Sequence, residues 1–179
     1  MNQYLRLLWV FFTARFRPAC PVLGPCYTSM RVGLTDLDVL RHVNNGVYLS
    51  MGDVGRMDLL LRSGLWARLK RDMPFAVVAA ETIQFGKSLN LFQRFRIETT
   101  VLGWDDRLFY LQQRFLRGEQ AVATSVVALR FLRRTGGTVD PHEVLKTAGE
   151  PQHSPELPAW IADWSASMRE LRQATEPQR

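Results

Sequence analysis

The feature that most constrains the fold is a change of hydrophobic period near the middle of the chain. Residues 46–65 place apolar side chains at helical spacing, whereas segments within residues 76–132 alternate apolar and polar side chains. A period of 3.6 residues is typical of an amphipathic helix, and a period of two is typical of a strand with one buried face. The sequence therefore predicts one long helix followed by a set of β-strands.

The predicted long helix has recognisable ends. Asn44 or Asn45 offers a side-chain oxygen for the N-cap, and Gly64 is a suitable stop. Gly52 and Gly55 lie inside the helix, where each glycine costs about 1 kcal/mol relative to alanine. We therefore expect another backbone to approach the helix closely at these two positions.

Four strands are predicted after the helix and a shorter one before it, at residues 76–85, 93–101, 108–116, 120–132 and 28–34 respectively. The turn-rich links at 103–107 and 117–119 are short, so consecutive strands must be antiparallel neighbours. The predicted fold class is α+β, with one major helix covering an antiparallel sheet. Because apolar sheet surface would remain uncovered, we expect the chain to dimerise.

The chain divides into three parts at changes of composition. Residues 1–26 form an apolar and basic helix with a proline-containing connector, residues 27–134 form the α+β domain, and residues 135–179 form an acidic extension with a helix at 158–173. The sheet is expected to end at residues 133–137. A total of 179 residues is the length of one ordinary domain.

The most apolar run of the chain is residues 4–12. It is too short to cross a bilayer, which needs about 20 apolar residues. Two interpretations remain open. The run can form an amphipathic helix packed on the body of the domain. Alternatively, residues 1–17 form an interfacial helix whose aromatic side chains enter lipid while its arginines stay at the headgroups.

Charge and cysteine content narrow the classes of partner. The chain carries 23 Lys and Arg against 17 Asp and Glu, a net charge of +6, but it has no pattern typical of a nucleic-acid-binding module, so we expect no nucleic-acid partner. Cys20 and Cys26 match neither a redox nor a zinc motif. Without a secretory signal, two reduced thiols predict a cytoplasmic protein, peripheral on the inner membrane face if the N-terminal helix is interfacial.

One polar segment, residues 35–48, concentrates groups that can do chemistry. Asp36, Asp38, His42 and two asparagines directly precede the long helix. A carboxylate there can act as base or nucleophile, and the backbone N–H groups at a helix start can hold an oxyanion. The competing interpretation is structural, with Asp36 as turn former, Asn45 as helix cap and His42 as hydrogen-bonded packing.

The pattern D-x-D-x-x-x-H-V-N-N-x-x-Y in this segment resembles the signature of hotdog-fold acyl thioesterases of the 4-hydroxybenzoyl-CoA thioesterase type. Residues 102–111 and 156–158 extend the resemblance to the branch called thioesterase superfamily member six and its bacterial relatives. The resemblance covers residues 28–165. It implies a hotdog fold, in which an antiparallel sheet wraps one long helix and two protomers join sheet edges. It also implies an acyl-CoA thioesterase that needs no metal or cofactor beyond the CoA of its substrate.

The resemblance also assigns roles to residues of the motif. Asp38 matches the catalytic carboxylate, which is either general base or nucleophile, and His42 matches a residue that positions substrate or water. The backbone N–H groups around Asn45 match the oxyanion contact. Asn44 and Tyr48 match positions of the substrate-binding region, where they hold the loop in place and take no part in the chemistry. By charge alone, the candidates for the CoA phosphates are Arg94, Arg96, Arg114 and Arg130, which can equally form a solvated strand face.

The chain departs from the family pattern at two positions. Many relatives have Gly where Arg41 stands, and the acyl-carrier-protein branch has a catalytic Asn where this chain has Leu40. The leading prediction is hydrolysis of an acyl-CoA by a homodimer or a dimer of dimers. The alternative is a catalytically weak, membrane-associated protein that binds lipid or acyl groups or acts as a scaffold. Hydration of enoyl-CoA fits least. The hotdog proteins that hydrate enoyl-CoA resemble an Asp-x4-His pattern, whereas three residues separate Asp38 from His42 in this chain.

Overall fold

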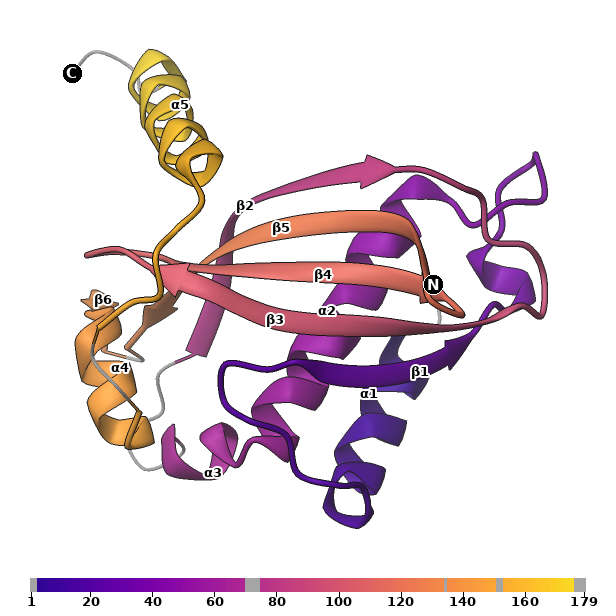
Figure 1. Ribbon diagram of the computed structural model, residues 1–179, viewed down its shortest axis with the longest axis horizontal. Coiled ribbons are helices and arrows are strands. Elements are labelled where there is room, and N and C mark those ends of the chain that lie inside the picture. The colour runs from indigo at the N-terminus through magenta and orange to yellow at the C-terminus, as the bar shows by residue number, and fades with distance from the viewer. Residues whose placement is uncertain (1–2, 70–74, 134, 151–152, 176–179) are drawn as a thin grey trace.

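The computed structural model describes residues 3–69, 75–133, 135–150 and 153–175. A curved antiparallel sheet wraps one face of the helix α2 (Asn45–Arg62), as Figure 1 shows. The strands are β1 (Cys26–Arg31), β2 (Phe75–Phe85), β3 (Arg94–Trp104), β4 (Phe109–Arg117), β5 (Gln120–Leu132) and β6 (Thr138–Val139). They are ordered β1-β3-β4-β5-β2, and β6 also pairs with β5. The predicted α+β class is confirmed.

Several predicted boundaries differ from the observed ones. β1 ends before residues 32–34, because a 3-10 turn, η2 (Leu34–Asp36), begins there. The prediction that the sheet ends at residues 133–137 is wrong, since β6 adds to it. The helix α4 (Pro141–Ala148) follows, with Asp140 as its N-cap. A short helix, α3 (Leu65–Leu69), follows α2, and residues 70–74 lie outside the described ones.

The helix α2 begins and ends as its sequence predicts, but its glycines have another cause. Asn44 is the N-cap, and Gly64 adopts a φ of +74° just beyond the end. A Cβ at Gly52 would lie 2.7 Å from Gln113 Oε1, and one at Gly55 would lie 3.0 Å from Gln113 Nε2. The expected close approach of a backbone is therefore wrong: the buried side chain of Gln113 occupies that space.

Gln113 also connects the sheet to α2 through a buried polar network. Its amide donates to the Gly52 carbonyl at 2.9 Å and to Thr99 Oγ1 at 3.1 Å, and its carbonyl accepts from Arg56 Nη1 at 2.6 Å. Each polar group of the fully buried amide thus has a partner, which removes the cost of burying it.

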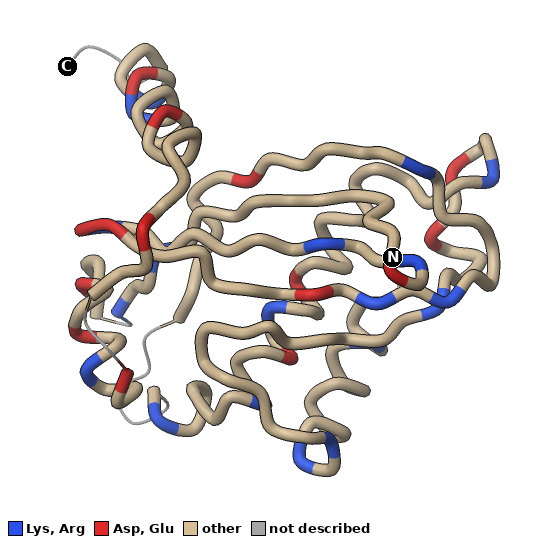
Figure 2. Tube along the Cα trace, in the orientation of Figure 1, with Lys and Arg blue, Asp and Glu red and all other residues tan. Residues whose placement is uncertain are grey.

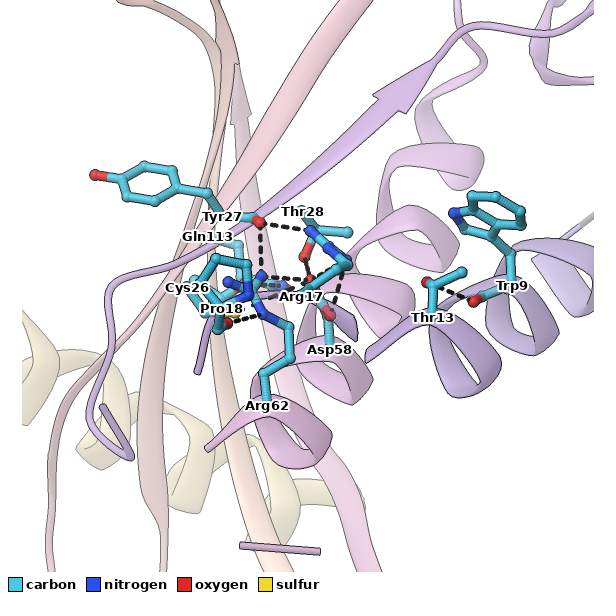
Figure 3. Close-up of polar contacts among 11 residues, drawn as sticks. Trp9, Thr13, Arg17, Pro18, Cys26, Tyr27, Thr28, Asp58, Arg62 and Gln113 are labelled. Carbon is cyan, nitrogen blue, oxygen red and sulfur yellow. Dashed lines mark hydrogen bonds and ion pairs between the residues drawn. The ribbon is translucent and has the colours of Figure 1, made fainter. Parts of the chain in front are cut away.

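The N-terminal segment packs on α2 and is held there by ion pairs. It consists of α1 (Gln3–Thr13) and a 3-10 turn, η1 (Ala14–Phe16). Asp58 of α2 is fully buried and accepts from Arg17, from Arg62 and from Thr28 Oγ1, the last at 2.7 Å (Figure 3). Three donors around one buried carboxylate offset its loss of water.

The C-terminal helix α5 (Ala159–Thr175) covers part of the sheet face opposite α2. Ile161 and Trp164 pack there with Val126 and Tyr110. The Tyr110 hydroxyl donates to Asp105 Oδ2 at 2.6 Å and lies 3.0 Å from Ser165 Oγ. Burial, followed by the bond to Asp105, raises the pKa of Tyr110 to about 12.

Side chains from both sides of residue 134 share one core. Val139, Val144 and Leu145 pack in the same cluster as Leu59 and Phe109. The three-part division of the chain stays a prediction. Every helix among the described residues is too short or too polar to reach across a bilayer.

Candidate active site

The first carboxylate of the D-x-D pair is part of the scaffold. Asp36 is fully buried at the end of η2, where it accepts from the Gly33 N–H at 2.7 Å and from both terminal nitrogens of Arg6. Its carbonyl accepts from the Asn44 N–H at 2.9 Å, which ties the turn to the start of α2. Every contact of Asp36 therefore fixes the loop.

The second carboxylate is placed differently. Asp38 is half-buried, and its Oδ1 accepts from the backbone N–H groups of Leu40 at 2.9 Å and His42 at 3.3 Å. These bonds form a tight turn that orients the carboxyl group. No hydrogen-bond donor among the described residues meets Oδ2, so this oxygen can accept a proton from another molecule.

The turn around Asp38 contains both positions at which the chain departs from the family pattern. Arg41 adopts a φ of +62°, in the left-handed region that glycine occupies without strain. Val39 and Leu40 lie at the tip of the turn with 97% and 71% of their surfaces exposed. The side chain at position 40, where the acyl-carrier-protein branch has an amide, is thus an exposed apolar group beside Asp38.

The remaining motif residues lie at or near the N-terminus of α2. The side chain of Asn44 accepts from the Gly46 N–H at 2.9 Å as the N-cap. Asn45 is the first helical residue, and its own N–H meets no acceptor within the described parts of the chain. His42 is exposed, its backbone bridges to Asn90, and its ring forms no hydrogen bond with a described residue.

Tyr48 is a core residue. Its ring contacts Phe85 and Phe115 edge-on, with centroids 5.3 and 5.1 Å away. Burial raises the pKa of its hydroxyl, and a backbone contact with Leu89 acts in the opposite direction. Tyr48 therefore holds the segment after β2 against the first turns of α2.

The four candidate phosphate-binding arginines lie on the sheet face opposite α2. Their strand neighbours, such as Phe95 and Leu129, point into the core, and side chains alternate along a strand. Arg96 pairs with Glu119 at 2.7 Å and Arg114 with Glu98 at 3.1 Å. Arg94 and Arg130 form no ion pair with a described residue. Their role toward a substrate stays a prediction.

An apolar cavity of about 280 Å³ lies between α2 and the sheet, and no pattern in the sequence predicts it. Its lining comes from eight helices and strands and includes Leu7, Met57, Leu60, Phe109 and Leu129. Because residues so far apart in sequence form it, only the folded chain reveals it. None of Asp38, His42, Asn44, Asn45 and Tyr48 lines it.

Polar groups lie at one side of this cavity. Arg56 and Asp53 line it and pair at 2.6 Å, and Arg56 also lies 3.5 Å from Glu81. Burial raises the pKa of Glu81, and Arg56 opposes this shift. The rest of the lining is almost entirely apolar, as a hydrocarbon ligand requires. Within the described ranges, no three His, Cys, Asp or Glu side chains are grouped to hold a metal.

Comparison with known proteins defines the class. Residues 32–165 match the family model described as the thioesterase-like superfamily, and this chain belongs to that superfamily. Protein THEM6 of Danio rerio is 33% identical over 172 residues, which cover 94% of this chain and 85% of that protein.

Solved structures confirm the predicted hotdog fold. The YbaW probable thioesterase from Escherichia coli aligns with a TM-score of 0.63 and 22% identity over 68% of this chain and 94% of that one. A gentisyl-coenzyme A thioesterase aligns with a TM-score of 0.61 and 17% identity over 68% of this chain and 99% of its own.

Proposed function

We propose that the protein hydrolyses acyl-CoA thioesters with Asp38 as general base, as a member of the 4-hydroxybenzoyl-CoA type close to bacterial relatives of THEM6. The observation that carries this is the carboxyl group of Asp38, oriented through Oδ1 and open at Oδ2. A carboxylate held in this way can take a proton from water that attacks a thioester carbonyl. The reaction needs no metal or cofactor.

The start of α2 supplies the second requirement of the reaction. Attack on the carbonyl carbon makes a tetrahedral oxyanion, and the unpaired Asn45 N–H at the positive end of α2 can stabilise it. When the intermediate collapses, the C–S bond breaks, the thiolate takes up a proton, and the free acid leaves. Direct attack by the Asp38 carboxylate, through a mixed anhydride that water then opens, is the other course.

The apolar cavity is the proposed site for the acyl chain, and a homodimer would join it to Asp38. β2 is an edge strand, and Ala76 and Val78 of β2 line the cavity. A twofold axis through paired β2 edges would set the two α2 helices antiparallel. The Asp38 loop of one protomer, which precedes α2, would then face the C-terminal half of α2 in the other, where Met57 and Leu60 line the cavity.

The test is release of free thiol from acyl-CoAs of increasing length and from aromatic acyl-CoAs. Asp38→Asn keeps the shape of the side chain but removes the base, so we expect at least a hundredfold loss of kcat. Asp106→Asn is the matched control, because Asp106 is an exposed carboxylate that does not line the cavity and forms no ion pair with a described residue. Equal turnover by Asp38→Asn and the parent would exclude Asp38 as the base.

One observation favours the alternative, acyl binding without efficient hydrolysis. Leu40 places an exposed apolar group beside Asp38 where an amide could orient the carboxylate. If the parent binds acyl-CoA but releases no thiol from any member of the panel, this second function is supported and the first is excluded.

A further inference from the structure

The outward face of α1 is more apolar than the face turned toward the protein. Its exposed positions are all aromatic or large aliphatic side chains with more than half of their surface accessible: Tyr4, Leu5, Leu8, Trp9, Phe11 and Phe12. The other side of α1 carries Gln3, Arg6 and Thr13 beside Leu7 and Val10. A helix that only had to cover α2 in water would show the opposite arrangement.

These six side chains and Phe16, which is 76% exposed in η1, form one surface that we call the aromatic face. The Phe11 and Phe12 rings contact each other edge-on at 5.8 Å. Figure 3 shows the Trp9 ring directed away from the ion network around Asp58. A contiguous apolar surface of this kind marks an interaction site rather than scattered surface hydrophobicity.

The surroundings of the aromatic face are basic. Residues 3–35 contain four arginines and no acidic residue. Arg15 lies over the Phe16 ring at 4.6 Å, and Arg31 is adjacent to α1 because its carbonyl accepts from Arg6. Neither Arg15 nor Arg31 forms an ion pair with a described residue. Figure 2 shows further Lys and Arg where β1 ends and β3 begins.

Charge and composition together identify the partner. Two copies of a basic face would repel each other, whereas an anionic bilayer attracts it. Trp, Tyr and Arg are side chains that place an apolar part in lipid and a polar tip at the headgroups. The 11 residues of α1 are too few to span a bilayer, so the helix would lie in its plane.

We propose that α1 docks the protein on an anionic lipid surface. The aromatic face enters the boundary between headgroups and acyl chains, while Arg15 and Arg31 contact the headgroups. Leu7, on the other side of α1, lines the apolar cavity, which docking would bring within about 10 Å of lipid, the diameter of one helix. The docking itself does not depend on the proposed hydrolysis.

The test is co-sedimentation of the full chain with vesicles of phosphatidylcholine alone or mixed with phosphatidylglycerol. Leu5→Ser/Trp9→Ser changes two residues that are 62% and 68% exposed, so the fold should persist. Trp160→Ser/Leu171→Ser is the matched control in α5, at 46% and 67% exposure. On the mixed vesicles we expect the α1 double variant to lose at least about tenfold in partition coefficient and the control to match the parent.

Two further measurements separate insertion from simple adsorption. Brominated acyl chains should quench the fluorescence of the parent, and Trp9→Phe should remove most of that quenching. Arg15→Gln should weaken binding to the mixed vesicles and leave binding to phosphatidylcholine unchanged.

The proposal is overturned if the parent does not sediment with anionic vesicles or if both double variants bind these vesicles equally well. It is also overturned if Leu5→Ser/Trp9→Ser changes the oligomeric state, measured by light scattering, while the parent fails to sediment with lipid. The aromatic face would then be a contact between copies of the chain.

Discussion

The guanidinium of Arg6 holds the carboxylate of Asp36 through two parallel hydrogen bonds, Nη1 to Oδ1 at 2.9 Å and Nη2 to Oδ2 at 2.6 Å. The Asp36 side chain is 1% exposed and that of Arg6 is 21% exposed. Since Asp38 follows two residues later, the N-terminal helix fixes the loop that carries the proposed base.

Arg6→Met should therefore destabilise the fold. The change leaves the Asp36 carboxylate buried with the Gly33 N–H as its remaining donor among the described residues, and we expect a loss of about 2–4 kcal/mol in the free energy of unfolding. Urea unfolding measures it. Arg15→Met, at an exposed arginine without a described ion pair, should stay within about 0.5 kcal/mol of the parent. Similar losses in both variants would show that the pair with Asp36 contributes nothing.

Loss of one hydrogen bond to the buried carboxylate of Asp58 should destabilise the fold less than Arg6→Met does. Thr28→Val removes the 2.7 Å hydrogen bond to Asp58 while the side chain keeps its size, and a bond to a charged group contributes about 1.5–3 kcal/mol. Thr100→Val, half-buried on β3, is the control. If thermal unfolding shifts equally in the two variants, the loss comes from the threonine hydroxyl in general and not from Asp58.

Tyr110 should make stability depend on alkaline pH. Its pKa in the folded state is raised to about 12 by burial and by Asp105, whereas a tyrosine in an unfolded chain titrates near 10. The folded state thus favours the protonated hydroxyl. Its contribution is complete below pH about 10 and is lost as the pH rises toward about 12.

Comparison of Tyr110→Phe with the parent measures this contribution. We expect the variant to be less stable by about 1–3 kcal/mol at pH 8, with a difference that shrinks above pH about 10. Tyr4→Phe, at a 77% exposed position, should show no such trend. A difference between Tyr110→Phe and the parent that stays constant up to pH 12 would contradict the raised pKa.

The cavity should set the acyl length that the protein accepts. Ala76→Phe adds a ring to the cavity lining, so we expect kcat/KM for long acyl-CoAs to fall by about tenfold or more while short ones stay within about twofold. The short substrate is the internal control. Equal losses on both substrates would show that the change disturbs the reaction centre and not the acyl site.

Mixed dimers should reveal whether Asp38 and the cavity come from different protomers. Asp38→Asn and Ala76→Phe chains are refolded together. If each site combines Asp38 of one protomer with the cavity of the other, every heterodimer has one site with both features intact and one site with neither. Long-chain activity should then exceed that of either variant alone. Activity no higher than the average of the two variants would place Asp38 and the cavity in the same protomer.

Local patterns in the sequence predicted most of the fold because each depends on neighbouring residues. The alternation of Phe95, Ile97 and Thr99 located β3, and Asn44 and Gly64 located the ends of α2. β6 has two residues and forms only because Val139 pairs with Phe131. So short a strand has no periodicity of its own.

The candidate site was predictable only as far as it is contiguous. Residues 35–48 form one loop and one helix start, so their proximity follows from the chain itself. The burial of Asp36 by Arg6 could not be foreseen, because 30 residues separate them. The cavity depends on side chains such as Leu7 and Leu129 that meet only in the folded chain.

The two ion pairs of the N-terminal segment make it an integral part of the folding unit. A chain without residues 1–17 would keep Asp36 and Asp58 in place but would lose Arg6 and Arg17, one partner of each buried carboxylate. Such a truncation would remove both ion pairs together with the aromatic face. Proteolysis within this segment is therefore expected to destabilise the whole fold and not only to remove a surface helix.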